Sequence, residues 1–359
     1  MQKKRALIAM SGGVDSSVAA YLMKKEGLDC IGATMKLYES DQAGFIRSHT
    51  CCSLDDVEDA RSVAERLDMP YYVFNFMDGF EQKIIDKFIR SYEAGWTPNP
   101  CIDCNRYMKF DQLYERARLL SCDYVVTGHY ARIEQEGDRY LLKKARDASK
   151  DQSYVLYAMS QEDLAHTRFP LGNLEKTQTR KLAEEAGFIN AEKPDSQDIC
   201  FVPDGDYARV IEERTGRAYP PGDFLSIDGK KLGRHQGIIH YTLGQRRGLG
   251  IASDRPLYVQ EIRPLENTVI LGHEEDLYSQ KVEVADFHWI SGTSPREMRK
   301  LRAKLRYRQK EEPCQVQVEE DGHVWLIFDE PQRAVTKGQA AVVYDGDVVL
   351  GGGTIVGRA

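Results

Sequence analysis

The stretch of sequence that decides the fold is Ser11-Gly12-Gly13-Val14-Asp15-Ser16-Ser17. An apolar run, residues 6–10, precedes it, and residues 16–26 follow with the periodicity of a helix. A strand, a glycine turn and a helix start in this order aim backbone N–H groups, and the positive end of the helix, at an anion. The two glycines let a phosphate approach the backbone closely, and the serines add hydroxyl donors. The stretch therefore predicts a phosphate-binding loop at the start of an α/β domain.

The spacing within this stretch excludes two common nucleotide loops. A Walker A loop needs a lysine after its second glycine, and none follows Gly13. The stretch does not fit Gly-x-Gly-x-x-Gly either. Ser-Gly-Gly-x-Asp-Ser resembles instead the pyrophosphate loop of ATP pyrophosphatases, enzymes that adenylate a substrate and release pyrophosphate. The alternative is an ordinary glycine-containing turn between a strand and a helix.

Outward from the loop, strand patterns and helix patterns alternate. Strand-like runs cover residues 29–37, 70–76 and 123–127, and helical patterns cover residues 57–67, 79–92 and 110–120. This alternation predicts right-handed crossovers and a doubly wound parallel sheet with helices on both faces. Ligands bind at the carboxyl ends of such strands, and the loop, Met35 and Gly128-His129 all fall on that edge.

The pattern changes twice along the 359-residue chain, which is long enough for two or three domains. Residues 1–205 are predicted to form an α/β domain of the ATP-pyrophosphatase type (adenine nucleotide alpha hydrolase-like). Residues 206–275 are predicted to form a small, glycine-rich central domain. From residue 281 onward apolar residues alternate with period two, with turns at Asp321-Gly322 and Asp345-Gly346. Residues 276–359 are therefore predicted to form a C-terminal antiparallel β-barrel.

Composition bounds the class of protein. The chain is 42% hydrophobic and 29% charged, as is usual for a globular protein. No apolar run approaches the roughly 18 residues of a membrane-spanning helix, and the run after the basic N-terminus is too short for a signal peptide. We therefore expect a cytoplasmic protein with no membrane partner. The net charge of −7 argues weakly against a nucleic-acid partner, unless basic residues gather locally.

Basic residues do gather in residues 300–308, Lys-Leu-Arg-Ala-Lys-Leu-Arg-Tyr-Arg. Read as a strand, this segment directs its apolar residues to one face: Leu301, Ala303, Leu305 and Tyr307. The other face then carries five cations: Lys300, Arg302, Lys304, Arg306 and Arg308. Cations in a row repel one another unless a polyanion lies across them, which favours an RNA backbone as the partner. The alternative is a solvated face balanced by neighbouring acids such as Glu311 and Glu312.

The cysteines indicate what chemistry follows adenylation. Eight cysteines are too few for a secreted disulfide scaffold of this length. Cys101 and Cys104 form a Cys-x-x-Cys in residues 96–105, whose prolines and asparagines predict a loop, and Cys200 lies in a second loop, residues 193–201. Thiolates are strong nucleophiles that can displace AMP, and they can carry sulfur as a persulfide. ATP activation, cysteines on two loops and a basic strand together suggest sulfur transfer to RNA.

Further stretches carry a resemblance that covers essentially the whole chain. They are Met10-Ser11-Gly12-Gly13-Val14-Asp15-Ser16-Ser17, Thr97-Pro98-Asn99-Pro100, Cys104-Asn105 with Lys109-Phe110, Thr127-Gly128-His129-Tyr130, Lys150-Asp151-Gln152-Ser153-Tyr154, Phe169-Pro170-Leu171-Gly172, Asp195-Ser196-Gln197-Asp198-Ile199-Cys200-Phe201, Tyr241-Thr242-Leu243-Gly244-Gln245-Arg246-Arg247-Gly248-Leu249-Gly250 and Arg306-Tyr307-Arg308. With these, the chain closely resembles the bacterial tRNA-uridine 2-sulfurtransferases, the MnmA (TrmU) family of tRNA-specific 2-thiouridylases.

The resemblance implies ATP-dependent thiolation at C2 of the uridine at wobble position 34, in tRNAs for Lys, Glu and Gln. The products would be 2-thiouridine, AMP and pyrophosphate, and Mg²⁺ would accompany the ATP. Cys200 would carry a persulfide delivered by a sulfur-relay protein or a cysteine desulfurase. Cys104, the other catalytic cysteine, would release sulfur from that persulfide or close a disulfide with Cys200 once the sulfur has left.

The resemblance also assigns binding residues by their positions in the motifs. ATP would be held by Ala9, Met10, Ser11, Gly12, Gly13, Val14, Asp15, Ser16, Met35 and Gly128. The target base would lie beside Asn99, Pro100 and Cys101. Other contacts to tRNA would come from His129, Lys150, Asp151, Gln152, Arg306, Tyr307 and Gln339.

Cys101 departs from the pattern, because many members of the family carry Asp at this position. Cys101, Cys104 and Cys200 could instead supply three thiolates to a [4Fe–4S] cluster, with one iron open to bind sulfide. The spacing permits both the persulfide relay and the cluster.

Several alternatives stay open. The chain could be another tRNA thiolase or an amide-forming ligase of the ATP-pyrophosphatase type, or a non-catalytic, nucleotide-regulated RNA-binding protein. His129 could be a structural residue at a strand end, and residues 150–152 could form a plain turn. No catalytic role is predicted for Cys51 and Cys52.

Overall fold

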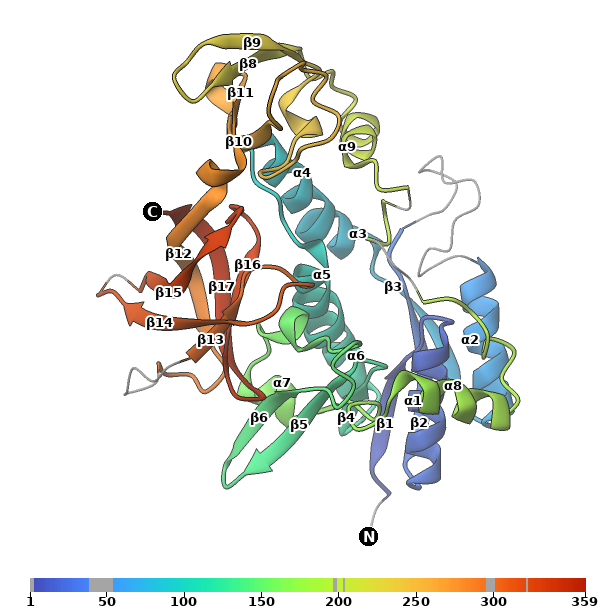
Figure 1. Ribbon diagram of the computed structural model, residues 1–359. Helices are drawn as coiled ribbons and strands as arrows, with labels where there is room; N and C mark the ends of the chain where they lie inside the picture. The colour runs from blue at the N-terminus through green and yellow to red at the C-terminus, as the bar shows by residue number, and fades with distance from the viewer. Residues whose placement is uncertain (1–2, 39–53, 196–198, 203, 295–300, 321) are drawn as a thin grey trace.

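The computed structural model describes residues 3–38, 54–195, 199–202, 204–294, 301–320 and 322–359 (Figure 1). Several residues named above lie outside the described residues: Cys51, Cys52, Ser196, Gln197, Asp198, Lys300 and Asp321.

The N-terminal region is built on a parallel sheet, as predicted. In the described part of the chain this sheet has five strands in the order β3-β2-β1-β4-β7. Their bounds are Arg5–Ala9 for β1, Asp29–Lys36 for β2, Tyr71–Asn75 for β3, Tyr124–Val126 for β4 and Thr167–Arg168 for β7. The order runs outward from β1 in both directions, so the topological switch point lies between β1 and β4, where such sheets bind ligands.

Alternate residues of β1 point into two different cores, which explains the double winding. Ala6 and Ile8 pack with Val18 of helix α1 (Val14–Lys25), on the face that α2 (Leu54–Arg66) and α8 (Lys176–Glu185) also cover. Leu7 packs on the opposite face with residues of α3 (Met77–Phe80), the π-helix η2 (Glu81–Ile85) and α4 (Asp86–Glu93).

One predicted loop is correct only over residues 96–99, which have no regular secondary structure. Residues 96–105 were expected to be irregular, but a helix begins at Pro100 and continues through α5 (Pro100–Asp103), the π-helix η3 (Cys104–Gln112) and α6 (Leu113–Leu119). Asn99 caps it, since its side-chain oxygen accepts the Cys101 N–H at 3.2 Å. Pro100 takes the first helical position, where its missing N–H is not needed. Cys101 and Cys104 therefore lie in the first turns of a helix.

The central region contains a small sheet in the order β10-β11-β8-β9, among the residues described. The strands are β8 (Gly222–Ser226), β9 (Lys231–His235), β10 (Tyr258–Arg263) and β11 (Thr268–Gly272), and they follow helix α9 (Tyr207–Thr215). Buried residues of this sheet, including Phe224 and Val259, belong to the same core as Phe88 of α4. The small sheet thus packs directly on the N-terminal region.

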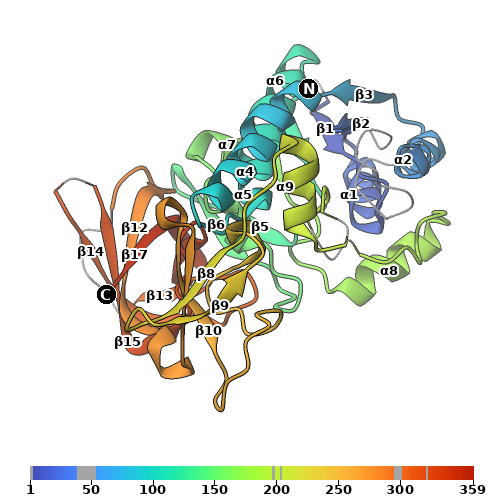
Figure 2. The same cartoon turned by 90° about the horizontal axis from the view of Figure 1, so that it is seen from above.

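The C-terminal region is the predicted antiparallel barrel. Within the described chain, strands in the order β12-β15-β14-β13-β16-β17 close on themselves through a β12–β17 pairing. The bounds are Tyr278–Trp289 for β12, Leu301–Lys304 for β13, Glu312–Val318 for β14, Val324–Arg333 for β15, Ala340–Asp345 for β16 and Val348–Arg358 for β17. Figure 2 shows the barrel on one side of α4 and α6 and the parallel sheet on the other.

The predicted row of five cations on one strand face is wrong. Strand β13 ends at Lys304, and the chain then turns. Leu301, Ala303 and Leu305 are buried as expected. Arg306, however, folds inward and donates to the Ala334 carbonyl oxygen at 2.7 Å and to Thr336 Oγ1 at 2.8 Å. Period-two alternation holds only while the strand lasts, so it misplaces Arg306, which lies beyond the end of the strand.

The hairpin β5–β6 joins the two largest regions. It consists of β5 (Ala131–Glu136) and β6 (Arg139–Lys144), which pair antiparallel across a turn at Gly137. It extends the barrel sheet, because Lys143 of β6 pairs with Val348 of β17. Arg132 and Lys144 add ion pairs to Asp347 and Glu311, both at 2.5 Å. The division at residues 205 and 275 therefore stays a prediction, since one hairpin assigned to the first part completes a sheet of the third.

Among the described residues, no helix combines the length and apolar character needed to cross a membrane.

Candidate active site

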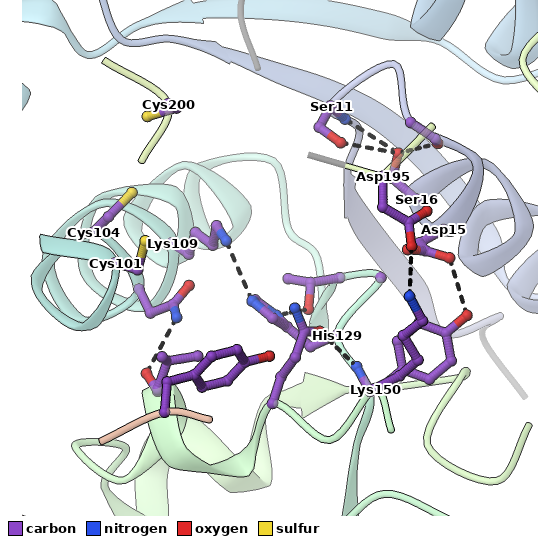
Figure 3. A pocket seen from close by; sticks show the side chains of 18 of the residues that line it. Ser11, Asp15, Ser16, Cys101, Cys104, Lys109, His129, Lys150, Asp195 and Cys200 are labelled. Atoms are coloured by element: carbon purple, nitrogen blue, oxygen red, sulfur yellow. Dashed lines mark hydrogen bonds and ion pairs between the residues drawn. The ribbon is translucent and has the colours of Figure 1, made fainter. Parts of the chain in front are cut away.

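A cavity of about 1100 Å³ opens at the carboxyl edge of the parallel sheet (Figure 3). The ends of β1, β2 and β4 form its floor, the helix that starts at Pro100 forms one wall, and the turn after β13 reaches it from the barrel. Most predicted site residues border it: Ala9, Met10, Ser11, Gly13, Val14, Asp15, Ser16, Met35, Pro100, Cys101, Cys104, Gly128, His129, Lys150, Asp151, Gln152, Cys200 and Tyr307.

The glycine loop leaves the start of α1 open to a ligand. Gly13 is the N-cap and has no side chain to accept the first helical N–H groups, so these donors and the helix dipole face the cavity. The Ser16 hydroxyl accepts the Ser11 N–H at 3.2 Å and donates to the Gly13 carbonyl oxygen at 2.9 Å, which fixes the turn. Gly12 has φ of +72°, and a Cβ there would lie 2.3 Å from the Asp56 carbonyl oxygen. Gly12 does not border the cavity; it lets the loop pack on α2.

Gly128 also allows two backbone segments to pack closely. A Cβ at this position would lie 2.8 Å from the Asp15 carbonyl carbon and from the Ser16 nitrogen. The end of β4 therefore packs directly against the first turn of α1. This contact fixes the relative positions of the loop and of His129, which follows Gly128.

An ion-pair network surrounds Asp15. The Lys176 ammonium donates to both Asp15 oxygens, at 2.7 and 2.8 Å, and pairs with Asp195 at 2.6 Å. Lys150 pairs with the other Asp195 oxygen at 2.9 Å, and the Tyr130 hydroxyl donates to Asp15 at 3.0 Å. Burial alone would raise the pKa of Asp195, but the hydrogen bonds from Lys176 and Lys150 outweigh it and hold that pKa below its ordinary value. Asp15 and Asp195 are thereby tied together through Lys176.

Sequence reasoning missed Lys176. One signal was available, because a lysine at the first position of a helix opposes the helix dipole and needs an acidic partner. The partner, Asp15, lies 161 positions away, so nothing local identifies it.

His129 is held by two hydrogen bonds in the middle of the cavity wall. Its Nε2 lies 3.3 Å from the Lys109 ammonium, and its Nδ1 lies 2.6 Å from Thr127 Oγ1. An ammonium has only donors, so Nε2 accepts and Nδ1 carries the proton. Burial, and then the positive charge of Lys109, hold the pKa of His129 well below 6.5. The imidazole is therefore neutral at pH 7.

The three predicted cysteines border the same side of the cavity. Figure 3 shows Cys101, Cys104 and Cys200 together, with Ser11, Ser16 and Asp15 across the cavity from them. Cys101 is exposed, Cys104 and Cys200 are half-buried, and within the described residues none of the three forms a disulfide. The Tyr38 hydroxyl donates to the Cys200 carbonyl oxygen at 3.0 Å, which anchors that segment to the end of β2.

These cysteines do not form a preformed metal site. The part of the chain that the structure describes contains no group of three His, Cys, Asp or Glu side chains placed to hold a metal ion. A [4Fe–4S] cluster would need three thiolates around one centre, an arrangement that Cys101, Cys104 and Cys200 do not show among the described residues.

The segment from residue 147 to residue 153 is a turn built by its own side chains. Asp151 accepts the Ala145 N–H at 3.0 Å and the Ser153 hydroxyl at 2.8 Å, and Gln152 accepts the Tyr130 N–H at 2.9 Å. Tyr307 faces this turn from the barrel: burial raises its pKa, and the negative charges of Asp151 and Cys101 raise it further. The turn is structural and also lines the cavity.

Three further predicted residues lie away from the cavity and have structural partners. Asn99 caps the helix, Arg306 is folded into the barrel, and Gln339 donates to the Thr97 carbonyl oxygen at 2.8 Å. Gln339 therefore ties the barrel to the segment that leads into the cysteine helix.

Comparisons with known proteins cover the chain from end to end. Residues 4–204 match the family described as "tRNA methyl transferase HUP domain", residues 209–273 match "tRNA methyl transferase PRC-barrel domain", and residues 279–355 match "Aminomethyltransferase beta-barrel domain".

Two relatives share about half of their residues with this chain. A "tRNA-specific 2-thiouridylase MnmA" of Clostridioides difficile is 48% identical over 354 residues, covering 98% of both chains. The protein of the same name from Acetivibrio thermocellus is 49% identical over 358 residues, covering 99% of this chain and 100% of its own.

Solved structures are more distant. The "U34-tRNA thiolase NcsA from Methanococcus maripaludis with its [4Fe-4S] cluster" is 16% identical, with a TM-score of 0.35, and the match covers 60% of this chain and 72% of that one. A likeness of this size does not bear on the chemistry of the present cavity.

Proposed function

The chain belongs to the tRNA-specific 2-thiouridylase (MnmA) family, and on that premise we propose that it thiolates C2 of the uridine at wobble position 34 in tRNAs for Lys, Glu and Gln, using ATP. One observation carries the proposal. A single cavity is lined both by an open helix N-terminus that can bind phosphate and by the thiols of Cys104 and Cys200.

The first half-reaction is adenylation. The uridine O2 attacks the α-phosphorus of ATP, the bond from that phosphorus to pyrophosphate breaks, and pyrophosphate leaves. The N–H groups at the start of α1 and the Ser11 hydroxyl would hold the phosphates. Mg²⁺ binds through one or two carboxylates together with nucleotide phosphates, and Asp15 is the carboxylate beside the loop that would hold it. When bound, Mg²⁺ would neutralise charge on the departing pyrophosphate.

The second half-reaction transfers sulfur. A sulfur-relay protein or a cysteine desulfurase would load Cys200 with a persulfide. The outer sulfur attacks C2, and the C2–O bond breaks with its electron pair leaving on AMP. The Cys104 thiolate then attacks the Cys200 sulfur, and the sulfur–sulfur bond breaks toward the base, which gives 2-thiouridine and a Cys104–Cys200 disulfide. A thiol reductant restores the two cysteines before the next turnover.

The proposed steps follow the persulfide route rather than an iron–sulfur cluster, because that route needs only the thiols of Cys104 and Cys200, which border the cavity. Anaerobic purification with iron and sulfide analysis tests this choice. We expect colourless, iron-free protein that thiolates tRNA. Protein whose thiolation activity rises and falls with bound iron would overturn the persulfide route.

The proposed function is tested by incubating the protein with unmodified tRNA for Glu, ATP, Mg²⁺, cysteine and a cysteine desulfurase. Mass spectrometry of the digested tRNA should detect 2-thiouridine at position 34, and AMP should form in equal amount. Cys200→Ser should still form AMP but no thiolated base, and Asp15→Asn should form neither while tRNA binding persists. Thiolation of another nucleoside, or AMP formation that does not need tRNA, would contradict the proposal.

A further inference from the structure

Among the described residues, one lysine deep in the cavity has no carboxylate partner. Every carboxylate that lines the cavity in the described part of the chain is paired with a lysine: Asp15 with Lys176, Asp56 with Lys193, Asp151 with Lys304, Asp195 with Lys150 and Lys176, and Glu311 with Lys144. Lys109 is different, because its polar contact among the described residues is the neutral His129 at 3.3 Å.

Lys109 also differs in position from the other cavity cations that lack a carboxylate partner in the described chain. Arg302, Arg308 and Lys310 are exposed on the barrel side. Lys109 is half-buried, and Figure 3 shows it between the cysteines and the loop that carries Ser11 and Asp15. A partly buried cation without an anion is costly, so a protein keeps one where an anion binds.

The π-helix places Lys109 there. In η3 the backbone hydrogen bonds connect residues five apart, so Lys109 comes nearer to the face of Cys104 than an α-helix would bring it, since an α-helix aligns residues three and four apart. Both residues border the cavity. Short stretches of π-helix are frequent at functional sites, and here η3, which is nine residues long, brings a thiol and an ammonium toward the same space.

His129 orients the ammonium without neutralising it. Its Nε2 takes one of the three N–H donors of Lys109, which leaves two directed elsewhere. Its Nδ1 proton is committed to Thr127 in a buried hydrogen bond, so the ring cannot turn without breaking that bond.

We propose that Lys109, held by His129, is a catalytic residue of the adenylation step, and that its ammonium binds the phosphate that comes to join the target uridine to AMP. The assignment rests on the proposed function. As O2 bonds to the α-phosphorus and pyrophosphate departs, Lys109 stabilises the charge on the non-bridging oxygens of that phosphate. The same contact stabilises AMP when sulfur displaces it.

The test compares Lys109→Met, which keeps the length and removes the charge, with Lys109→Arg, which keeps the charge. Lys181→Met is the matched control, because Lys181 lies on α8 outside the cavity lining and its side chain is 75% exposed. For each variant, single-turnover AMP formation is measured with saturating tRNA and ATP, tRNA affinity is measured separately, and the melting temperature is recorded. Removal of one preorganised charge donor costs about 10²- to 10³-fold in rate, so Lys109→Met should lose that much with tRNA affinity within about twofold.

Lys109→Arg should recover at least tenfold of the loss, and Lys181→Met should leave both the tRNA affinity and the saturated rate within about twofold of wild type. Wild-type AMP formation in Lys109→Met would overturn the assignment, as would an equal loss in Lys109→Met and Lys109→Arg when both melt like the wild type. Failure of the wild type itself to form AMP with tRNA would be a different result, because it would overturn the proposed function and this assignment together.

Discussion

Gly12 shows how one missing side chain permits the nucleotide loop. Its φ of +72° lies in the left-handed region, and the Asp56 carbonyl oxygen occupies the space where a Cβ would lie. We expect Gly12→Ala to lower the free energy of unfolding by more than about 2 kcal/mol, since left-handed strain costs about 1–2 kcal/mol and a backbone clash adds to it. Urea denaturation measures the change.

Gly27→Ala is the matched control, because Gly27 has φ of +88° but nothing within 4 Å of its missing Cβ. It should cost about 1 kcal/mol, from strain alone. Equal losses in the two variants would show that the clash with Asp56 is relieved at no cost.

His129 should make the stability of the folded protein depend on pH in the acidic range. Its pKa is lowered on folding, so the unfolded chain binds more protons below pH 6.5. Stability is fully present above that pH and is lost as the pH falls toward the folded pKa, with a slope of up to about 1.4 kcal/mol per pH unit.

The free energy of unfolding is measured between pH 7 and pH 5. In His129→Gln, its dependence on pH should fall by the amount that corresponds to the uptake of about one proton on unfolding. Burial also lowers the pKa of His235, so His235→Gln should reduce the slope independently and the two effects should add. An unchanged slope in His129→Gln would mean that the imidazole is already charged in the fold.

At the scale of single residues, the sequence was informative where the chemistry is local. The loop serines, Asp15 and the cysteines were identifiable because each lies in a short motif, and the structure gathers them around one cavity. Lys176 and Lys109 were not identified, because their roles depend on Asp15 and His129, which come from other elements. The catalytic and binding roles of all these residues stay predictions.

Because β13 ends at Lys304, the arginines expected to contact RNA differ from those predicted from the sequence. Arg302 and Arg308 are exposed on the barrel side of the cavity, whereas Arg306 is bonded to Ala334 and Thr336. The double variant Arg302→Ala and Arg308→Ala should flatten the salt dependence of tRNA binding by about 0.7–0.9 in log–log slope for each lost phosphate contact.

Arg306→Ala is the comparison within the same segment. It should leave the salt slope unchanged and lower the free energy of unfolding, since it removes the charged donor from two acceptors. Binding measured between 50 and 200 mM salt separates the cases, and a flatter slope in Arg306→Ala alone would contradict the assignment.

At the scale of elements, patterns that repeat were predicted well and boundaries set by single contacts were not. The parallel strands and the barrel follow from periodicity, which many residues share. The helix that begins at Pro100 depends instead on one cap, and the end of β13 at Lys304 depends on one turn. A proline next to an asparagine fits both a loop and a helix start, so the sequence could not decide between them.

The whole molecule should unfold as one unit. Leu142 of β6 is fully buried in a core that contains Tyr154 from the N-terminal region and Val342 and Val349 from the barrel. Leu142→Ala should cost about 2–5 kcal/mol, and tryptophan fluorescence and far-ultraviolet circular dichroism should shift together in urea.

Val318→Ala is the control, since Val318 lies in the barrel but is 46% exposed; it should change stability by less than about 0.5 kcal/mol. Separate transitions for the two signals would show that the barrel and the nucleotide-binding region unfold independently.

At this scale the sequence indicated the three architectures but not how they join. The sequence of β5 and β6 does not reveal which sheet receives this hairpin, because strand pairing across the chain is set by tertiary packing. The pairing of Lys143 with Val348 settles the question in the structure.

That pairing has a consequence for synthesis on the ribosome. Strand β6 emerges well before its partner β17, so translation at about 5–20 residues per second leaves the hairpin edge uncovered for on the order of tens of seconds. A nascent or prematurely terminated chain carries the nucleotide loop without the sheet that completes the cavity wall. Only a polypeptide that includes β17 closes the barrel through the β12–β17 pairing, so incomplete products would keep open strand edges and would be accessible to chaperones and proteases.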